Sequence, residues 1–303
     1  MFDDSIISFP SNPTGLYDPL RYMIGIGGKR IRPNLCLLAY SLYGGEPCQG
    51  ALEAAQALEI FHSFTLIHDD IMDHSPLRRG VPTVWKKWSE DTAILSGDVM
   101  LIEAYKHIVK VPQECRAAVV DLFSSTAGQV CEGQQYDMEF EALDSVSMSQ
   151  YENMIALKTA VLIACAAKTG ALVAGAPQNE CEALYRYGYD LGMAFQIADD
   201  YLDAYGDEKV FGKPIGGDVA NGKKSWLTLR AMEKAPDPEA FIELFKSRDF
   251  AAVKRQYDAL GVGGDALAEI VRFSDSAIAA LDGLHADTQP LLVFAEKLVG
   301  RVK

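Results

Sequence analysis

Helical periodicity runs through almost the whole chain and excludes most folds. Apolar residues recur at intervals of three and four, and no run shows the strict alternation of a half-buried strand. The pattern predicts an all-α fold with helices at residues 17–42 (interrupted around Gly27), 49–74, 91–109, 112–136, 148–170, 180–205, 223–233, 237–246, 249–260, 264–283 and 287–300. Turn residues cluster between these helices, but no cluster is long enough for a flexible interdomain linker. No repeat with a fixed period of about 30 to 50 residues is visible.

Composition narrows the classes of partner. Lys and Arg number 28 against 42 Asp and Glu, a formal net charge of −14, and 49% of the residues are hydrophobic. The apolar fraction is ample for a large core. The negative charge argues against broad attraction to nucleic acid or to an anionic membrane surface. Any bound anion must therefore be held by a local basic cluster.

The most apolar stretch, residues 159–176, could be considered as a membrane span. Lys168 and Gly170 interrupt it, which leaves too short a run to cross about 30 Å of hydrocarbon. We interpret it as a helix buried inside the protein. The N-terminal sequence MFDDSIISFPSNPTG has no secretory signal pattern, and the six scattered cysteines lack the spacing of a zinc site. We therefore expect a reduced, cytoplasmic protein without a membrane span.

Two acidic clusters share one pattern. They are HDDIMD and ADDYLD, with Asp69, Asp70 and Asp73 in the first and Asp199, Asp200 and Asp203 in the second. Positions i and i+4 of a helix lie on one face about 5–6 Å apart, so the outer carboxylates of each cluster can face one point. Each cluster ends a long apolar helix, where the helix dipole is negative and a positive group should offset it. Mg²⁺ is the natural candidate, whereas one such cluster alone would more often be a solvated helix end.

The scarce basic residues gather in three glycine-containing stretches. These are GGKRIRP with Lys29, Arg30 and Arg32, PLRRG with Arg78 and Arg79, and FGKPIGGDVANGKK with Lys213, Lys223 and Lys224. Glycine lets the chain approach a bulky anion, and Arg and Lys both suit phosphate oxygens. Each stretch alone could be a surface loop, but together with the acidic clusters they indicate a diphosphate held through Mg²⁺. The chain has no GxxxxGK[ST] element, so a P-loop nucleotide site is not expected.

Polar residues also lie inside apolar helices. Lys158 and Thr159 interrupt NMIALKTAVLIACAA, where an unpaired lysine would be costly to bury. We interpret Lys158 as an anion ligand, with a side chain that extends to solvent as the alternative. Gln196 precedes the second acidic cluster by one turn. His62, two turns before Asp69 on roughly the same face, fits a structural and a functional role equally well.

In this order, the motifs resemble those of the trans-isoprenyl diphosphate synthases, also called polyprenyl synthetases. The resemblance runs from GGKRIRP through HDDIMDHSPLRRGVPTVW, GDVMLIEAY, CEGQQYDMEF, ALKTAVL and FQIADDYLDAYGD to GKPIGGDVANGKKSWL. It implies an all-helical bundle, a single domain over residues 1–303 around a deep central cavity, usually in a homodimer. The two aspartate motifs would face each other across the mouth of the cavity.

The resemblance also implies roles for individual residues. Three Mg²⁺ ions, with Mn²⁺ as an alternative, would be bound directly by Asp69, Asp73 and Asp199, with contributions from Asp70, Asp200 and Asp203. The allylic diphosphate would contact Arg78, Lys158, Thr159, Gln196, Lys213 and Lys223. Isopentenyl diphosphate would contact Lys29, Arg32, His62 and Arg79. The residues expected to be catalytic are Asp69, Asp73, Asp199, Lys158 and Lys213.

The reaction implied is a head-to-tail (1'-4) condensation. Isopentenyl diphosphate would react with dimethylallyl, geranyl or farnesyl diphosphate to give all-trans farnesyl or geranylgeranyl diphosphate. Product length would depend on the cavity floor, for which Phe61, Phe64 and Thr65 are the candidates. The first motif lacks the insertion usual in bacterial farnesyl synthases, and Ser225 stands where the family often has threonine.

Two other functions fit parts of the sequence. A catalytically silent homologue that completes a partner synthase usually lacks a carboxylate or a basic ligand, and here every expected ligand is present. A terpene cyclase or a head-to-head coupling enzyme needs a different second metal motif. A cyclase also has no use for an isopentenyl site, so the GGKRIRP stretch favours the synthase.

Overall fold

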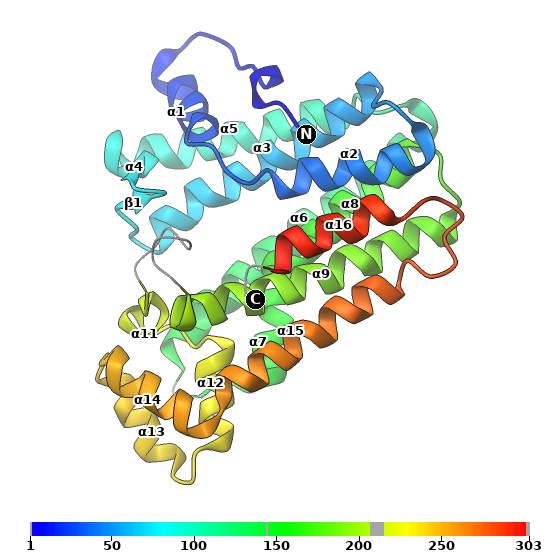
Figure 1. Ribbon diagram of the computed structural model, residues 1–303. Coiled ribbons are helices and arrows are strands. Elements are labelled where there is room, and N and C mark those ends of the chain that lie inside the picture. Colours follow the sequence, from blue (N-terminus) through cyan, green and yellow to red (C-terminus); the bar gives the residue numbers. More distant parts are fainter. Residues whose placement is uncertain (1, 144, 207–214, 301–303) are drawn as a thin grey trace. The chain divides into compact units, whose positions relative to one another are not determined.

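A computed structural model of the protein describes residues 2–143, 145–206 and 215–300. The chain forms two compact units, and each combines two separate stretches: Met1–Phe123 with Ala166–Cys181, and Ser124–Cys165 with Glu182–Lys303. Helices dominate both units (Figure 1), as the periodicity predicts.

The first unit is built around a long, alanine-rich helix. Its elements are η1 (Asp4–Ile6), α1 (Thr14–Gly25), α2 (Ile31–Gly44), α3 (Gln49–Met72), β1 (Leu77–Arg78), β2 (Val81–Pro82), α4 (Val84–Lys87), α5 (Glu90–Ile108), the start of α6 (Gln113–Ala142), the end of α8 (Val161–Val173) and the start of α9 (Gln178–Tyr205). Helix α3 packs against both α2 and α5. Every residue from Glu53 to Phe61 is buried, which is the pattern of a helix covered on all sides.

The second unit continues from α6. Its elements are α7 (Met148–Ile155), the π-helical turn η2 (Ala156–Ala160), the start of α8 (Val161–Val173), most of α9 (Gln178–Tyr205), α11 (Gly217–Asn221), α12 (Trp226–Lys234), α13 (Pro238–Lys246), α14 (Phe250–Leu260), α15 (Val262–Ala279) and α16 (Gln289–Val299). Helix α12 contacts α7, α13, α14 and α15.

Two glycines let helices approach the η2 turn closely. A Cβ atom added to Gly133 of α6 would lie 2.3 Å from the backbone nitrogen of Lys158, and one added to Gly192 of α9 would lie 2.6 Å from Cα of Ala160. These separations are too short for any side chain, so only glycine fits. The turn that carries Lys158 and Thr159 is therefore held closely between α6 and α9.

The predicted helices match the observed ones to within a few residues, with four differences. The hairpin of β1 and β2 was not predicted. Each strand is only two residues long, so neither could show the alternation by which a strand is recognised in sequence. The short helices η1, α4 and α11 were not predicted. The helix expected at 148–170 contains the η2 turn. Helix α6 extends to Ala142, six residues past its predicted end.

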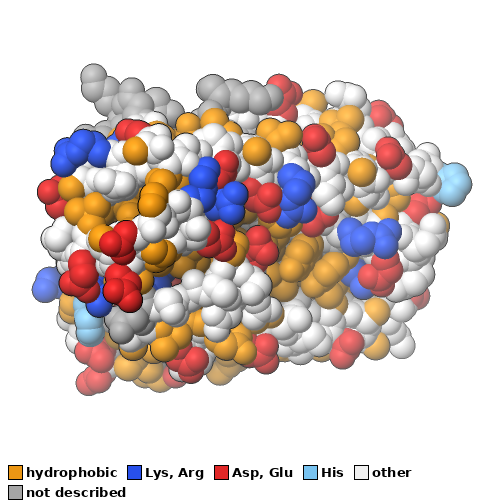
Figure 2. Space-filling view, turned by 90° about the horizontal axis from the view of Figure 1, so that it is seen from below, with side chains coloured by type: hydrophobic (Ala, Val, Ile, Leu, Met, Phe, Trp, Pro, Cys, Tyr) orange, Lys and Arg blue, Asp and Glu red, His pale blue; other side chains and the backbone are white. Residues whose placement is uncertain are grey.

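One helical run, Met148–Val173, is long and apolar enough to cross a membrane by length and composition. Within the protein, 72% of its most apolar window is buried, which favours the predicted core helix. On the face seen in Figure 2, acidic and basic side chains lie interspersed with hydrophobic ones. That face therefore presents no broad surface of one charge sign.

Candidate functional site

The first acidic cluster lies where α3 ends. Asp69 and Asp70 belong to the last turn, Asp73 is the C-cap residue, and His74 adopts the left-handed conformation with a φ of 49°. The N–H of Ser75 donates to the carbonyl of Asp70 at 2.9 Å, the long bond of a Schellman motif. The carboxylates are therefore held at the negative end of the α3 dipole, as the sequence predicts.

Arg78 neutralises the buried member of this cluster. Asp70 is 2% exposed, and its two oxygens accept hydrogen bonds of 2.8 Å from Nε and Nη2 of Arg78. Burial raises the pKa of Asp70, and Arg78 opposes part of that rise. Arg78 therefore supplies part of the positive charge that is expected at this helix end.

The hairpin that carries Arg78 also presents Arg79. Arg78 pairs with Val81 across the hairpin, and Arg79 and Gly80 between them both have positive φ angles, 52° and 79°, as a type I′ turn requires. A left-handed arginine is strained. A Cβ atom added to Gly28 would lie 2.8 Å from Nη1 of Arg79. The hairpin thus places Arg79 of the PLRRG stretch against Gly28 of the GGKRIRP stretch, within the first unit.

Positive charge surrounds His62 in the same unit. Burial is the main cause of a pKa well below the ordinary value for this histidine. The arginines whose charges lower it further are Arg32, Arg78, Arg79 and Arg30. His62 is therefore neutral near pH 7 and offers one hydrogen-bond donor and one acceptor.

Arg32 is a buried cation close to these groups. It is 8% exposed, and burial lowers its pKa to about 10 although the charge of Glu59 opposes the shift. The guanidinium is still protonated near pH 7. Its Nε has no hydrogen-bond partner within the part of the chain that the structure describes. The residues assigned to isopentenyl diphosphate, Lys29, Arg32, His62 and Arg79, all belong to the first unit.

A pocket of about 220 Å³ in the second unit is lined by seven of the other predicted residues. Those that line it are Lys158, Thr159, Gln196, Asp199, Asp200, Asp203 and Lys223. They come from η2, from the end of α9 and from the segment after α11. Carboxylates and ammonium groups share this cavity, which suits an anion bound together with a metal ion.

Asp200 is the centre of a buried hydrogen-bond network. Its Oδ2 accepts a hydrogen bond from the hydroxyl of Tyr151 and another, at 2.8 Å, from the N–H of Trp226. Its Oδ1 accepts one from Nε2 of Gln196 at 3.2 Å, and the side-chain oxygen of Gln196 accepts one from Thr159 at 3.1 Å. Burial raises the pKa of Asp200 to about 6 despite these bonds. The middle aspartate of the second cluster is therefore held by protein donors.

The last aspartate of the second cluster caps α11. The Asp203 carboxylate accepts hydrogen bonds from the N–H groups of Gly217, at 3.1 Å, and Asp218, at 3.0 Å. A negative charge is favourable at a helix N-terminus. The carboxylate of Asp218 also lines the pocket. Nothing in the sequence singles out this aspartate, because only the fold brings α11 to the end of α9.

Asp137 of α6 joins two lysines of the pocket. Its Oδ2 lies 2.6 Å from Nζ of Lys158 and 3.7 Å from Nζ of Lys223. Burial alone would raise the pKa of Asp137, but the two ammonium groups lower it below the ordinary value. Lys158 is thus paired within the protein, so its burial needs no bound anion. The motif CEGQQYDMEF contains Asp137, but nothing in its spacing singles out this residue.

Aromatic residues before the first cluster pack on one another. The ring centroid of Phe61 lies 5.5 Å from that of Phe64 and 5.3 Å from that of Phe123, and Tyr105 packs edge-on against Phe123 at 5.3 Å. Thr65, which follows Phe64 in the sequence, is half-buried. The role of Phe61, Phe64 and Thr65 in setting product length stays a prediction. Phe123 and Tyr105 join the aromatic group from distant parts of the sequence.

The oxygen donors of both clusters fit Mg²⁺. This ion prefers carboxylate oxygens and binds through one or two of them, together with waters and substrate phosphates. Among the residues that the structure describes, no three acidic, histidine or cysteine side chains are placed to hold one ion. Such an arrangement suits an ion that shares its coordination with a phosphate. Lys213, expected to contact the allylic diphosphate, lies outside the described residues.

A predominantly helical fold in which aspartate clusters lie beside basic side chains defines a class of protein suited to metal-bound diphosphates. Residues 13–260 match the family model of the polyprenyl synthetases. The chain belongs to this family, which confirms the resemblance seen in its motifs.

Similar proteins extend this result. The chain is 43% identical over 244 residues to the short chain isoprenyl diphosphate synthase of Methanothermobacter thermautotrophicus, with 78% of this chain and 74% of the relative covered. It is 39% identical over 247 residues to the geranylfarnesyl diphosphate synthase of Natronomonas pharaonis, with 76% and 72% covered. The crystal structure of a geranylgeranyl pyrophosphate synthase superposes with a TM-score of 0.92 and 41% identity over 97% of this chain and 94% of that one.

Proposed function

We propose that this protein is a short-chain isoprenyl diphosphate synthase that condenses isopentenyl diphosphate with an allylic diphosphate in a head-to-tail (1'-4) reaction. The observation that carries the proposal is the pocket of the second unit, where the second aspartate cluster shares one cavity with Lys158 and Lys223. Membership of the polyprenyl synthetase family supports the same activity.

The proposed metal ligands follow from the hydrogen bonds that the middle aspartates of the two clusters, Asp70 and Asp200, already make within the protein. Asp70 is bonded to Arg78, and Asp200 accepts three protein hydrogen bonds. Asp203 accepts two N–H hydrogen bonds at the start of α11. We therefore assign direct contact with Mg²⁺ to the other outer aspartates, which are Asp69, Asp73 and Asp199. When bound, the ions would neutralise charge on the departing diphosphate. The family resemblance is the support for three ions.

The side chains of this protein would bind and orient both diphosphates. The proposed contacts of the allylic diphosphate are Arg78, Lys158, Thr159, Gln196, Lys213 and Lys223, and those of isopentenyl diphosphate are Lys29, Arg32, His62 and Arg79. With the diphosphate stabilised, the allylic C1–O bond breaks and its electron pair leaves with the diphosphate. The double bond of isopentenyl diphosphate then joins its C4 to the allylic C1, and a proton from C2 passes to the diphosphate.

Twenty carbons is the product length that we propose, with the fifteen-carbon farnesyl product as the alternative. The similar crystal structure of a geranylgeranyl pyrophosphate synthase supports the longer product, and the buried pair of Phe61 and Phe64 supports an early stop. Phe64→Ala should lengthen the product. An unchanged product distribution would place the floor elsewhere.

We also propose one functional domain over residues 1–303, working as a homodimer. Neither compact unit is continuous in sequence, which argues against two independent domains. Leu95 and Ile102 of α5 and its C-cap residue, Val109, are exposed at intervals of seven residues. This spacing places three apolar side chains on one helix face, and a second copy of the chain would cover them.

A direct assay tests the activity. The purified protein is incubated with Mg²⁺, isopentenyl diphosphate and, in turn, dimethylallyl, geranyl and farnesyl diphosphate, and the dephosphorylated products are separated by chromatography. We expect all-trans products and diphosphate release. No turnover with any primer would contradict the synthase assignment, and an unchanged KM for isopentenyl diphosphate in Lys29→Ala would contradict the assignment of that site.

A further inference from the structure

Arg30 lies in strained backbone between two residues proposed to bind isopentenyl diphosphate. It is the N-cap residue of α2, with φ 48° and ψ 42° in the left-handed region. Lys29 precedes it, and Arg32 follows two residues later. A residue other than glycine keeps this conformation only where surrounding contacts hold it. Whatever holds Arg30 therefore also sets the directions of Lys29 and Arg32.

A set of buried and part-buried contacts holds the Arg30 side chain. Its Nε donates to both carboxylate oxygens of Asp4 at 2.8 Å, and its Nη1 donates to Glu59. Its Nη2 donates to Asp4 and, at 2.7 Å, to the carbonyl of Ile24. Arg30 is 8% exposed and Glu59 is 3% exposed. All three guanidinium nitrogens are thus bonded within the protein, so Arg30 does not act as a substrate ligand.

Asp4 belongs to an N-terminal segment, residues 2–13, which we call the strap. A second contact ties the strap to the same turn: the N–H of Phe2 donates to Oδ1 of Asn34 at 2.7 Å, and Nδ2 of Asn34 donates to the carbonyl of Arg30 at 2.7 Å. The strap therefore holds both the backbone and the side chain of Arg30.

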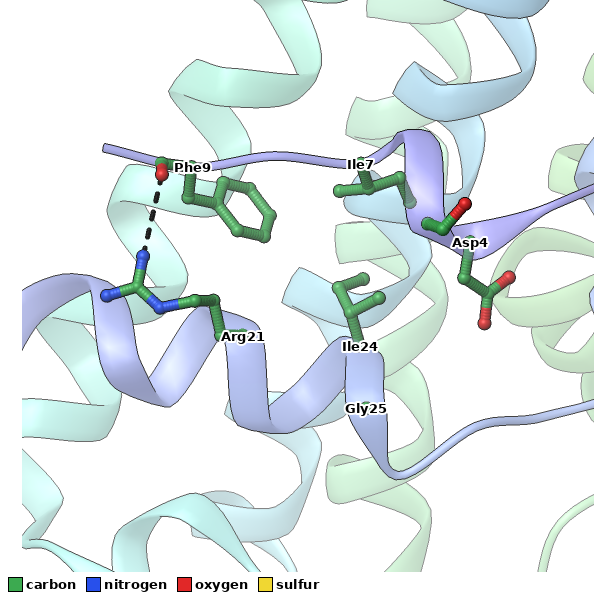
Figure 3. A pocket seen from close by; sticks show the side chains of 7 residues that line it. Asp4, Ile7, Phe9, Arg21, Ile24 and Gly25 are labelled. Atoms are coloured by element: carbon green, nitrogen blue, oxygen red, sulfur yellow. Dashed lines mark hydrogen bonds between the residues drawn. The ribbon is translucent and has the colours of Figure 1, made fainter. Parts of the chain in front are cut away.

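The strap is not packed tightly against the helix beneath it. A cavity of about 240 Å³ is lined by the strap and α1. Figure 3 shows Ile7 and Phe9 of the strap and Ile24 of α1 around it, and Arg21 donating to the carbonyl of Phe9. Apolar contact is incomplete here, and the polar contacts of Asp4 and Arg21 help to attach the strap.

We propose that Asp4 and Glu59 act through Arg30 as positioning residues for the isopentenyl diphosphate site. They hold the Arg30 backbone between Lys29 and Arg32, the second residue of α2. Gly28, against which the Arg79 guanidinium packs, lies two residues before Arg30. The strap is then part of the substrate site, although it does not touch the substrate. This inference rests on the proposed function of the protein.

A purely electrostatic role and a positioning role of Asp4 predict opposite changes in isopentenyl diphosphate affinity when its carboxylate is removed. The loss of a carboxylate makes the surroundings more positive, so Coulomb attraction alone would tighten the binding of a diphosphate. The loss of the anchor frees the Arg30 turn, which would weaken binding. Asp4→Ala and Asp4→Asn remove the same charge, but asparagine keeps one oxygen that can accept a hydrogen bond from Arg30.

The experiment measures isopentenyl diphosphate binding by calorimetry in the full-length protein. We expect Asp4→Ala to weaken binding about tenfold, by analogy with the loss of a residue that orients a metal ligand, and Asp4→Asn to lie between it and the wild type. The matched control is Glu46→Ala, which removes an exposed carboxylate of the first unit outside the strap and should leave the Kd unchanged. The KM for the allylic diphosphate and the Tm are measured in parallel.

Each result has one interpretation. Tighter or equal binding in Asp4→Ala would overturn the inference, as would equal losses for both substrates together with a large drop in Tm. A wild-type protein that does not bind isopentenyl diphosphate would contradict the proposed function instead. Weaker isopentenyl binding with an unchanged allylic KM supports the positioning role.

Discussion

Replacing Tyr151 with phenylalanine removes one donor from the buried network around Asp200. Tyr151 is 3% exposed, and its hydroxyl donates to Oδ2 of Asp200, which keeps a second bond from the N–H of Trp226. Hydrogen bonds to charged groups contribute about 1.5–3 kcal/mol, against about 0.5–1.5 kcal/mol between neutral groups. At pH 8, Asp200 with its pKa of about 6 is ionised. We expect Tyr151→Phe to lower the free energy of unfolding by about 2 kcal/mol.

Tyr187→Phe is the matched control for this substitution. Tyr187 is also buried in the second unit, and its hydroxyl donates at 2.7 Å to the neutral carbonyl of Leu291. Its loss should be about 1 kcal/mol. Urea unfolding in the presence of a chelator measures both variants without metal. Equal losses would refute the argument that Tyr151 stabilises a buried charge.

The same pair of variants tests the metal site by a measurement other than turnover. If Asp200 holds the second cluster in place, Tyr151→Phe should weaken Mg²⁺ binding in the presence of inorganic diphosphate, and Tyr187→Phe should not. Calorimetric titration measures both affinities. Unchanged Mg²⁺ affinity in Tyr151→Phe would mean that the network stabilises the fold without positioning the ligands.

Three further substitutions probe other parts of the protein. The pKa of His62 is depressed in the folded state, so its contribution to the free energy of unfolding is complete above the unfolded pKa of about 6.5 and falls at lower pH. His62→Gln should reduce the loss of unfolding free energy between pH 6.5 and 5.5 by about 1 kcal/mol, as measured by urea unfolding. An unchanged pH dependence would contradict this. Gly133→Ala must displace the backbone of Lys158 and should cost about 1–3 kcal/mol, whereas Gly128→Ala on the same helix meets no atom within 4 Å and should be neutral or stabilising. Equal Tm values for these two variants would count against the close approach. Ile102→Asp places a charge in the exposed apolar stripe of α5 and should give a monomer by light scattering, and a retained dimer would place the interface elsewhere.

Local patterns determined the fold class and most of the helices. The 3.6-residue period follows from backbone geometry and is repeated within each segment, so it is legible without knowledge of the rest of the chain. The position of both aspartate clusters at helix ends is local in the same sense, and α3 and α9 end where the sequence indicates. The family could be identified because its motifs occur in order along the chain.

The partners of the functional side chains were decided by the tertiary structure. Asp137 binds Lys158 across 21 residues, Tyr151 binds Asp200 across 49, and Arg30 binds Glu59 across 29. Each pair depends on how two helices pack, which no periodicity specifies. Sequence alone therefore indicated the acids and bases of the site, whereas packing in three dimensions decided which of them hold one another in place, because these contacts join residues that only the fold brings together.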